Sequence, residues 1–402
     1  MNRYPIQFLY AYLAILIWSP LPKASNRVWS QSLLCMLIMG LAMALVAFTT
    51  VKNKNPLPQL TLHKWPILLL GIVALWSTIQ TFPLPFAVIE VLSPGAASIY
   101  DMAQLDRFTL SLEPSETLQM AVLSWSLWLF FVMTILLVDT PDRMKTLMHT
   151  IVLCGVFQAV YGSFMTLSGL EYGFFHKKEF FLGRATGTFV ARAHLAGYLE
   201  MCLAVGIGLL VASLNRRHHE SWRRKLGHLL DTLLGPKMQL RIFLAFMVIA
   251  LELTRSRMGN TAFFVALPVC GIGMMLIQGK LHRGAIILIA SLMLVDFLIV
   301  GQWFGFDELA ERIETTSAET ESRDETIRDT LTMLNDYKIT GIGNGTYYSS
   351  FPQYQGPDIS GFWDHAHNDY LEFALELGMI GFLPLAMVMM VVSAAPPGPS
   401  YS

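Results

Sequence analysis

Two histidines stand two residues apart in the segment 363–372, which opens the last long apolar run of the chain. A helix beginning there would direct unsatisfied N–H groups and the positive end of its dipole towards water, where they attract phosphate and disfavour imidazolium. A neutral histidine at this point can take a proton from a hydroxyl group. Two alternatives stay open. His365 and His367 could bind a metal ion, although they diverge on a helix, or Asp364 could be the N-cap with both histidines as interface residues.

Two arginines, Arg255 and Arg257, lie between apolar runs at a depth where a charged side chain is costly and usually has a partner or a function. They are about 200° apart on a continuous helix, so both can face one cavity only if the helix breaks. Gly259 is the predicted break. Glu252, one turn before Arg255, could pair with it, so Arg257 is the stronger candidate for binding an anion.

The segment 187–194 enters another apolar run and contains Arg192 and His194. An arginine at the outer end of a membrane span can hold an anion or extend to lipid headgroups, and the sequence leaves both possibilities open. The acids Glu200 and Asp296 lie inside apolar runs. We interpret them as structurally paired rather than as a proton path.

The composition excludes an ordinary soluble protein. Of 402 residues, 54% are hydrophobic and 14% are charged, against about 25% charged in soluble domains. Lipid is the solvent that accommodates so much apolar surface. The net charge of −1 gives no overall field for nucleic acid. The four cysteines lie in apolar runs without metal-ligand spacing, so we predict neither a disulfide framework nor a metal site.

Apolar runs of about 17–22 residues recur, each long enough to cross about 30 Å of hydrocarbon. All must be helices, because lipid satisfies no backbone polar groups. The first run could pass for a signal peptide, but it lacks a small-x-small cleavage motif, and we expect it to be retained as a helix. The ten predicted spans are 5–20, 29–49, 65–83, 118–138, 147–166, 194–213, 240–256, 260–278, 284–301 and 373–393.

Lysine and arginine are distributed unevenly between these runs. One set of loops holds 15 of them in roughly 57 residues, and the opposite set holds 13 in more than twice that length. By the positive-inside rule, the first set and both termini are cytoplasmic. The basic loop 214–239 then contacts anionic membrane lipids. The outside receives the loops 84–117, 167–193 and 302–371, so every polar cluster above lies on that side.

The longest outer segment, 302–371, has 13 acidic and 4 basic residues, which predicts a soluble and at least partly folded loop. Its apolar spacing predicts a helix over 324–337. The glycines at 341–345 predict a tight turn at the end of that helix.

Taken together, these pieces resemble the O-antigen ligase/polymerase (Wzy-C) superfamily over residues 185–392. Each piece is short, but they occur in the order of the family, with a long outer loop before the last motif. The matching pieces are Gly187-Thr188-Phe189 through Ala196-Gly197-Tyr198-Leu199-Glu200, Ser256-Arg257-Met258-Gly259, Arg323 at the head of a helix, Gly341-Ile342-Gly343-Asn344-Gly345, and His367-Asn368-Asp369-Tyr370-Leu371 with Gly378 further on.

The expected fold is therefore an all-α, polytopic integral membrane protein of about ten transmembrane helices with one large extracytoplasmic loop. The resemblance implies a GT-C-like enzyme of the bacterial inner membrane whose site faces the periplasm. It would move a glycan from a polyprenyl pyrophosphate to a hydroxyl of lipid A-core or another glycan, inverting the anomeric carbon without metal or cofactor. Arg192, Arg257 and Arg323 would hold the pyrophosphate and His367 would be the base. Secondary candidates are His365, Asn368, Arg255 and His194.

The chain departs from the family pattern at two points. Relatives often have asparagine near Ala191 and Ala193, and they usually carry further spans after the histidine motif, so we expect a truncated C-terminus. We divide the chain into N-terminal transmembrane helices (1–184), a ligase-related domain (185–393) and a tail (394–402).

Three alternatives to a ligase remain. A polysaccharide polymerase of the same superfamily shares the donor and the motifs. A transporter of lipid-linked glycans would have charged residues spread through its spans and internal pseudo-symmetry, and neither is visible. A non-catalytic glycan assembly protein would keep the fold of the family, but its site would no longer be active.

Overall fold

The computed structural model describes residues 4–174, 176–214, 236–278 and 323–394. The predicted span 284–301 and Asp296 lie outside these residues, as do most of the basic loop and the first part of the long outer segment.

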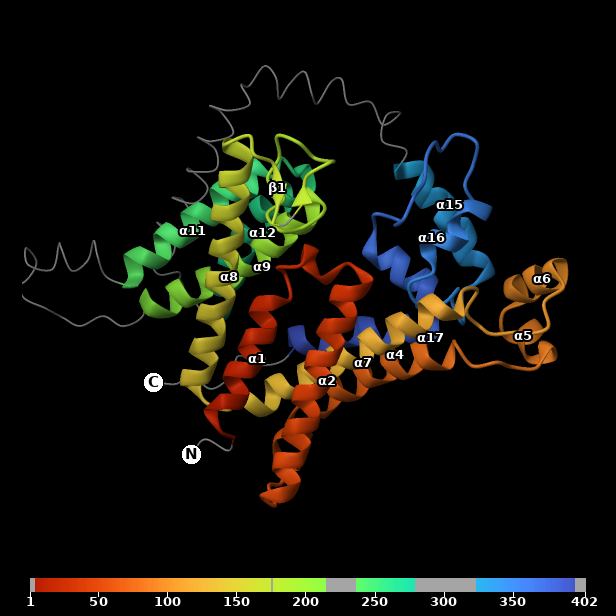
Figure 1. Cartoon of the computed structure of the whole chain (residues 1–402), viewed down its shortest axis with the longest axis horizontal. Coiled ribbons are helices and arrows are strands. Elements are labelled where there is room, and N and C mark those ends of the chain that lie inside the picture. The colour runs from red at the N-terminus through yellow and green to blue at the C-terminus, as the bar shows by residue number, and fades with distance from the viewer. Residues whose placement is uncertain (1–3, 175, 215–235, 279–322, 395–402) are drawn as a thin grey trace, which may run out of the picture. The chain divides into compact units, whose positions relative to one another are not determined.

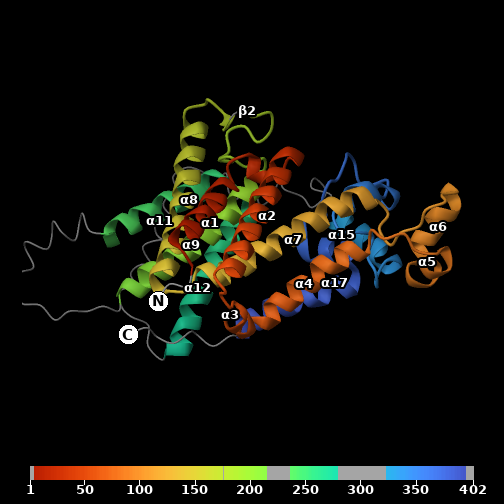
Figure 2. The ribbon, with the colours of Figure 1, turned by 60° about the horizontal axis from the view of Figure 1, so that its bottom comes forward.

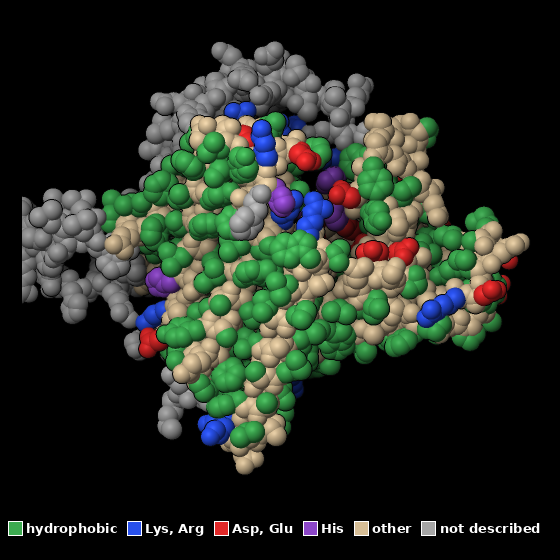
Figure 3. All heavy atoms as spheres, viewed as in Figure 1, with side chains coloured by type: hydrophobic (Ala, Val, Ile, Leu, Met, Phe, Trp, Pro, Cys, Tyr) green, Lys and Arg blue, Asp and Glu red, His purple; other side chains and the backbone are tan. Residues whose placement is uncertain are grey.

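Helices coincide with nine of the ten predicted spans. Five helices of the described chain, α2, α7, α8, α9 and α17, are long and apolar enough to cross a membrane, and α1 and α4 are shorter apolar helices. Hydrophobic side chains cover most of the face seen in Figure 3. The chain is an all-α membrane protein, as predicted, whereas the count of ten spans stays a prediction. The bounds are α1 (Ile6–Trp18), α2 (Val28–Val51), α4 (Lys64–Ile79), α7 (Pro114–Leu137), α8 (Pro141–Leu167), α9 (Arg192–Leu214), α11 (Pro236–Leu253), α12 (Arg257–Gln278) and α17 (Asp369–Ala394).

The helices form two compact units. The first comprises residues 1–34 and 138–313, and in its described part α8, α9 and α11 pack on one another, with α1 on α8 and α12 on α9 (Figure 1). A Cβ atom on Gly155 would lie 2.6 Å from the Cβ atom of Cys202. Small residues at this position let membrane helices approach closely. A short hairpin of β1 (Tyr172–Gly173) and β2 (His176–Lys177) follows α8.

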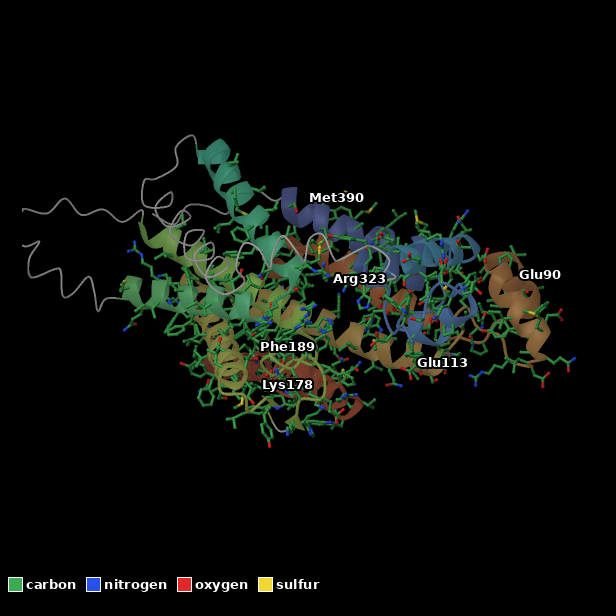
Figure 4. The ribbon with its side chains drawn as sticks, turned by 90° about the horizontal axis from the view of Figure 1, so that it is seen from above. Glu90, Glu113, Lys178, Phe189, Arg323 and Met390 are labelled. Atoms are coloured by element: carbon green, nitrogen blue, oxygen red, sulfur yellow. The ribbon has the colours of Figure 1, made fainter. Side chains whose placement is uncertain are left out.

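The second unit comprises residues 35–137 and 314–402. Helix α4 lies between α7 and α17 (Figures 1 and 2), and α3 (Leu57–Leu62) precedes it. One end of this trio bears a layer of short helices. In Figure 4, Glu90 and Glu113 lie towards that layer, whereas Met390 marks the far end of α17. The layer consists of α5 (Phe86–Leu92), α6 (Pro94–Ala103), α15 (Arg323–Asp336), α16 (Tyr347–Ser350) and η4 (Phe351–Gln353).

The layer joins two of the predicted outer loops in one hydrophobic core. Ile89 of α5 and Met333 of α15 are fully buried in the same cluster. The backbone N–H of Leu112 donates to the carbonyl oxygen of Ile342 at 2.8 Å. The two segments therefore pack together within one unit, whereas the side of the membrane on which they lie stays a prediction. The predicted helix over 324–337 is confirmed as α15.

Helix α17 is interrupted at Gly378, where φ is 60° and ψ is −177°. The carbonyl groups beside this break accept hydrogen bonds from outside the helix, so the loop 341–345 and α4 replace its internal bonds. The donors are Ile342 N to Leu375 O (3.0 Å), Gly343 N to Glu376 O (3.1 Å), Gln80 Nε2 to Glu376 O (2.9 Å) and Trp76 Nε1 to Leu377 O (2.7 Å).

This close approach requires glycine on both sides. A Cβ atom on Gly341 would lie 2.2 Å from the carbonyl oxygen of Glu376, and one on Gly378 would lie 2.3 Å from that of Ile339. Both glycines also have positive φ, which other residues rarely adopt. The predicted turn at 341–345 is thus present, and it fits into the break of α17.

Candidate functional site

The arginine motif of the first unit lies at a helix break, but not at Gly259 as predicted. Helix α11 ends at Leu253, and Arg255 has a left-handed backbone with φ of 50°. The Oγ atom of Ser256 accepts the N–H of Gly259 at 3.3 Å. Ser256 therefore caps α12, which begins at Arg257, and this cap places the break three residues earlier than predicted.

Arg192 is the first residue of α9 and contacts this motif directly. Its Nη1 atom donates to the carbonyl oxygen of Arg255 at 2.7 Å, and its guanidinium lies 6.0 Å from the ring centre of Phe181. The preceding segment is held to α11, because Ala185 N donates to Leu253 O at 2.8 Å. The structure thus brings the first two arginine motifs together in one unit.

A buried polar network fixes the start of the first motif. Gln158 Nε2 of α8 donates to the Oγ1 atom of Thr188 at 2.8 Å, and Gln158 Oε1 accepts the N–H of Thr188 at 3.0 Å. The hydroxyl of Thr188 also bonds to the carbonyl oxygen of Pro20. Gly187 has φ of 56°, and a Cβ atom there would lie 2.5 Å from Gln158 Oε1. His194 is exposed in the first turn of α9.

The histidine motif of the second unit precedes its helix instead of opening it. The Oδ1 atom of Asn368 accepts the N–H of Leu371 at 3.2 Å, so Asn368 is the N-cap and α17 begins at Asp369. The alternative with Asp364 as cap is therefore wrong, as is the expectation that both histidines lie on the helix. His367 has a left-handed backbone with φ of 52°.

His365 is engaged by an acid. Its Nδ1 atom lies 2.7 Å from Oε1 of Glu372, and Oε2 of the same carboxylate accepts the N–H of Ala366 at 2.9 Å. The hydrogen bond to Glu372 raises the pKa of His365 to about 9, against an ordinary value of 6.5. His365 is therefore an imidazolium at neutral pH and cannot accept a proton there.

His367 has the opposite character. Partial burial lowers its pKa, and the positive charge of Arg323 lowers it further. The imidazole ring makes an edge contact with Trp363, with ring centres 5.3 Å apart. Arg323 heads α15, as predicted, and is labelled in Figure 4. His367 is therefore the neutral imidazole of the motif at pH 7.

Sequence reasoning missed Glu372, although it is the residue that separates the roles of the two histidines. It lies seven positions after His365, so no local spacing predicts the pair. The sequence does contain a signal for the start of α17: Asn368 is a good cap residue, and the acid Asp369 follows it. With that start, Glu372 falls in the first turn, next to the preceding segment. Among the described residues, no three metal-ligating side chains come together.

Residues 242–386 match the O-antigen ligase family. This range contains Arg257, Arg323 and His367, whereas Arg192 precedes it. The resemblance noted in the sequence is confirmed over this range, and the family indicates a membrane enzyme that processes glycans. No curated protein and no solved structure matches the chain.

Proposed function

We propose that the chain is a membrane glycosyltransferase of the O-antigen ligase type. It moves a glycan from a polyprenyl pyrophosphate to an acceptor hydroxyl at the outer face of the inner membrane. The observation that supports this best is the contrast between the two histidines of the family segment. His365 is held as a cation by Glu372, whereas His367 stays neutral beside Arg323.

The chemistry requires one base and a group of cations. Neutral His367 takes the proton of the acceptor hydroxyl while its oxygen forms a bond to the anomeric carbon. The bond from that carbon to the pyrophosphate breaks, and the electron pair leaves with the pyrophosphate. Arg192, Arg257 and Arg323 stabilise the leaving charge, because guanidinium groups bind phosphate oxygens in bidentate pairs. Enough arginines at the leaving group make a metal ion unnecessary.

His367→Ala should reduce transfer about 10²–10⁴-fold, the usual effect of losing a positioned base, while the donor still binds. His365→Ala should be milder, because this histidine is already protonated. The measurement is transfer by the purified chain in nanodiscs, with a chelator present, to lipid A-core and to a lipid-linked glycan. Use of the second acceptor alone would make the enzyme a polymerase.

The pH profile provides a second readout of the same assignment. Because the pKa of His367 lies below 6.5, the rate should fall only as the pH drops below that value. An active His367→Ala with an inactive His365→Ala would reverse the roles. Loss of activity with the chelator would mean that the two histidines bind a metal ion.

Arg257→Lys should lose most of the transfer while the protein still inserts, because lysine keeps the charge but not the bidentate geometry. Donor binding and transfer are measured on the same purified variant. Lys237→Arg on α11 is the matched control, since it makes the reverse exchange outside the motif and should transfer normally. Normal transfer by Arg257→Lys would remove Arg257 from the pyrophosphate site.

A further inference from the structure

A cavity of about 580 Å³ lies in the first unit, outside the arginine and histidine motifs. One wall is the connection between α1 and α2, which includes the turn η1 (Lys23–Ser25), and the other is the β1–β2 hairpin. These two segments lie next to each other in Figures 1 and 2. The volume is in the range of small-molecule sites, about 300–1,000 Å³.

The lining combines cations with aromatic rings. Lys23 and Arg27 face the cavity from the first wall together with Trp29, and Phe174 and His176 face it from the hairpin. Aromatic rings pack against the apolar C–H faces of sugars, and arginine and lysine bind phosphate oxygens. The lining therefore fits a ligand that has both groups.

The two cations have no counter-ion of their own in the part of the chain that the structure describes. No carboxylate there forms an ion pair with Lys23 or Arg27. On the same hairpin, by contrast, Lys178 is paired with Glu171. In the predicted topology this short loop is outside, where the positive-inside rule disfavours lysine and arginine. Cations kept there, facing a cavity and without an ion pair among the described residues, point to an anionic ligand.

Both walls have strained backbones. Three successive residues, Lys23, Ala24 and Ser25, have φ of 51°, 54° and 55°, and Phe174 on the hairpin has φ of 60°. The turn is held by Ser25 Oγ, which donates to Ser19 O at 2.7 Å. Non-glycine residues in this region persist only where the surroundings fix them, and they concentrate at binding sites.

The hairpin is fixed as well. The hydroxyl of Tyr161 on α8 accepts the N–H of Phe174 at 2.7 Å and lies 3.2 Å from the carbonyl oxygen of Tyr172. The first wall adjoins the family motif, because the carbonyl oxygen of Pro20 accepts the hydroxyl of Thr188. The cavity is thus preformed and adjacent to the segment that leads to Arg192.

We infer that this cavity binds a phosphorylated sugar of the glycan substrate. Arg27 and Lys23 contact the phosphate, and Trp29 and Phe174 pack on the sugar ring. The inference rests on the proposed function, because it assigns to this cavity a second part of the same glycan substrate. An anionic lipid headgroup presents the same phosphate without the sugar, so the experiment separates these two sources.

The test uses the full chain labelled with 5-fluorotryptophan in phosphatidylcholine nanodiscs, with the Trp29 resonance assigned by Trp29→Phe. Glucose 6-phosphate should shift this ¹⁹F resonance saturably. Glucose and inorganic phosphate should each bind about tenfold more weakly or worse, because each lacks half of the contacts. Lys23→Gln with Arg27→Gln should weaken glucose 6-phosphate at least about tenfold. Lys177→Gln, on the same hairpin but outside the lining, should bind as the wild type does.

Four results would overturn the inference. They are the absence of a saturable shift, equal affinity for phosphate alone, a shift produced only by nanodiscs containing phosphatidylglycerol, and wild-type affinity in the double variant. Saturable binding of glucose 6-phosphate by a chain that transfers no glycan would instead refute the proposed function. The assignment of a phosphorylated sugar to this cavity would still stand.

Discussion

Glu372→Gln should change the charge of His365 while keeping the shape of the segment before α17. The glutamine side chain can still accept the N–H of Ala366, which the carboxylate accepts at 2.9 Å. It cannot stabilise an imidazolium as an anion does. The pKa of His365 should therefore fall from about 9 towards 6.5, so that the ring loses most of its charge at neutral pH.

The size of the effect follows from the same pair. A rise from 6.5 to about 9 corresponds to about 3 kcal/mol of interaction between the two charges. The side chain of His365 is 55% exposed, and solvent screening reduces this to about 1 kcal/mol. Because the folded pKa lies above the unfolded value, this stabilisation is complete below pH 6.5 and is lost as the pH rises through about 9.

The assay is a titration of histidine ring signals by NMR, on the chain with isotope-labelled histidine, with His365 assigned by His365→Gln. His367 is the internal control. The charges of Glu372 and His365 act on its pKa in opposite directions, so removing both should leave it below 6.5. Stability of wild type and variant, measured from pH 6 to pH 10, should differ by about 1 kcal/mol at the acid end and converge at the alkaline end.

Two results would refute this reasoning. Titration of His365 near 6.5 in the wild type would mean that the pair with Glu372 does not form. A pKa that stays near 9 in Glu372→Gln would assign the shift to other acids. The first result would remove the distinction between a cationic and a neutral histidine, on which the choice of His367 depends, whereas the second would remove only the role of Glu372.

Two further predictions concern the fold and the topology. Gly341→Ala should destabilise the chain by more than about 2 kcal/mol, because its Cβ atom would meet a backbone oxygen at 2.2 Å. Gly361 has a similarly positive φ, but a Cβ atom there would meet open space. Gly361→Ala should therefore lose less stability than Gly341→Ala when thermal unfolding is measured in detergent. Equal losses of stability would refute the steric argument. Ser349→Cys in a Cys270→Ala background should react with an impermeant maleimide on intact spheroplasts, since Ser349 is exposed. Reaction only after lysis would invert the topology.

Hydropathy predicted the helices well, because an apolar run in lipid has no alternative to a helix. It could not predict the break in α17, since Gly378 lies within an apolar run and the bonds that fill the break come from Trp76 and Gln80. Those residues are about 300 positions away, in the predicted span 65–83, which lies outside the region that resembles the family. The two compact units were equally hidden, because each combines segments from distant parts of the chain.

The assignment of the site residues stays a prediction, but the local geometry around two of them differs from what the sequence predicted. Both errors concern helix starts: Ser256 caps α12 and Asn368 caps α17. In each case the sequence contains a good cap residue, although the apolar run itself begins later, at residue 260 or 373. The separate roles of His365 and His367 depend on the turn between them, and propensity does not determine a left-handed histidine.

The described segment before the histidine motif, from α15 to η4, has a physical role in supporting that motif. The carboxylate of Glu376 accepts the N–H groups of Gly345 and Tyr347, at 2.8 and 3.0 Å, so the first two turns of α17 are bonded to the layer of short helices. One turn earlier on the same helix, Glu372 holds His365. Because Gly378 interrupts the helix beyond these turns, the histidine motif is positioned by the layer of short helices more than by the part of α17 that follows the break. A neutral base next to a cationic neighbour needs such a rigid support, since the charge of His365 depends on a 2.7 Å contact with Glu372 and the neutrality of His367 depends on its partial burial near Arg323.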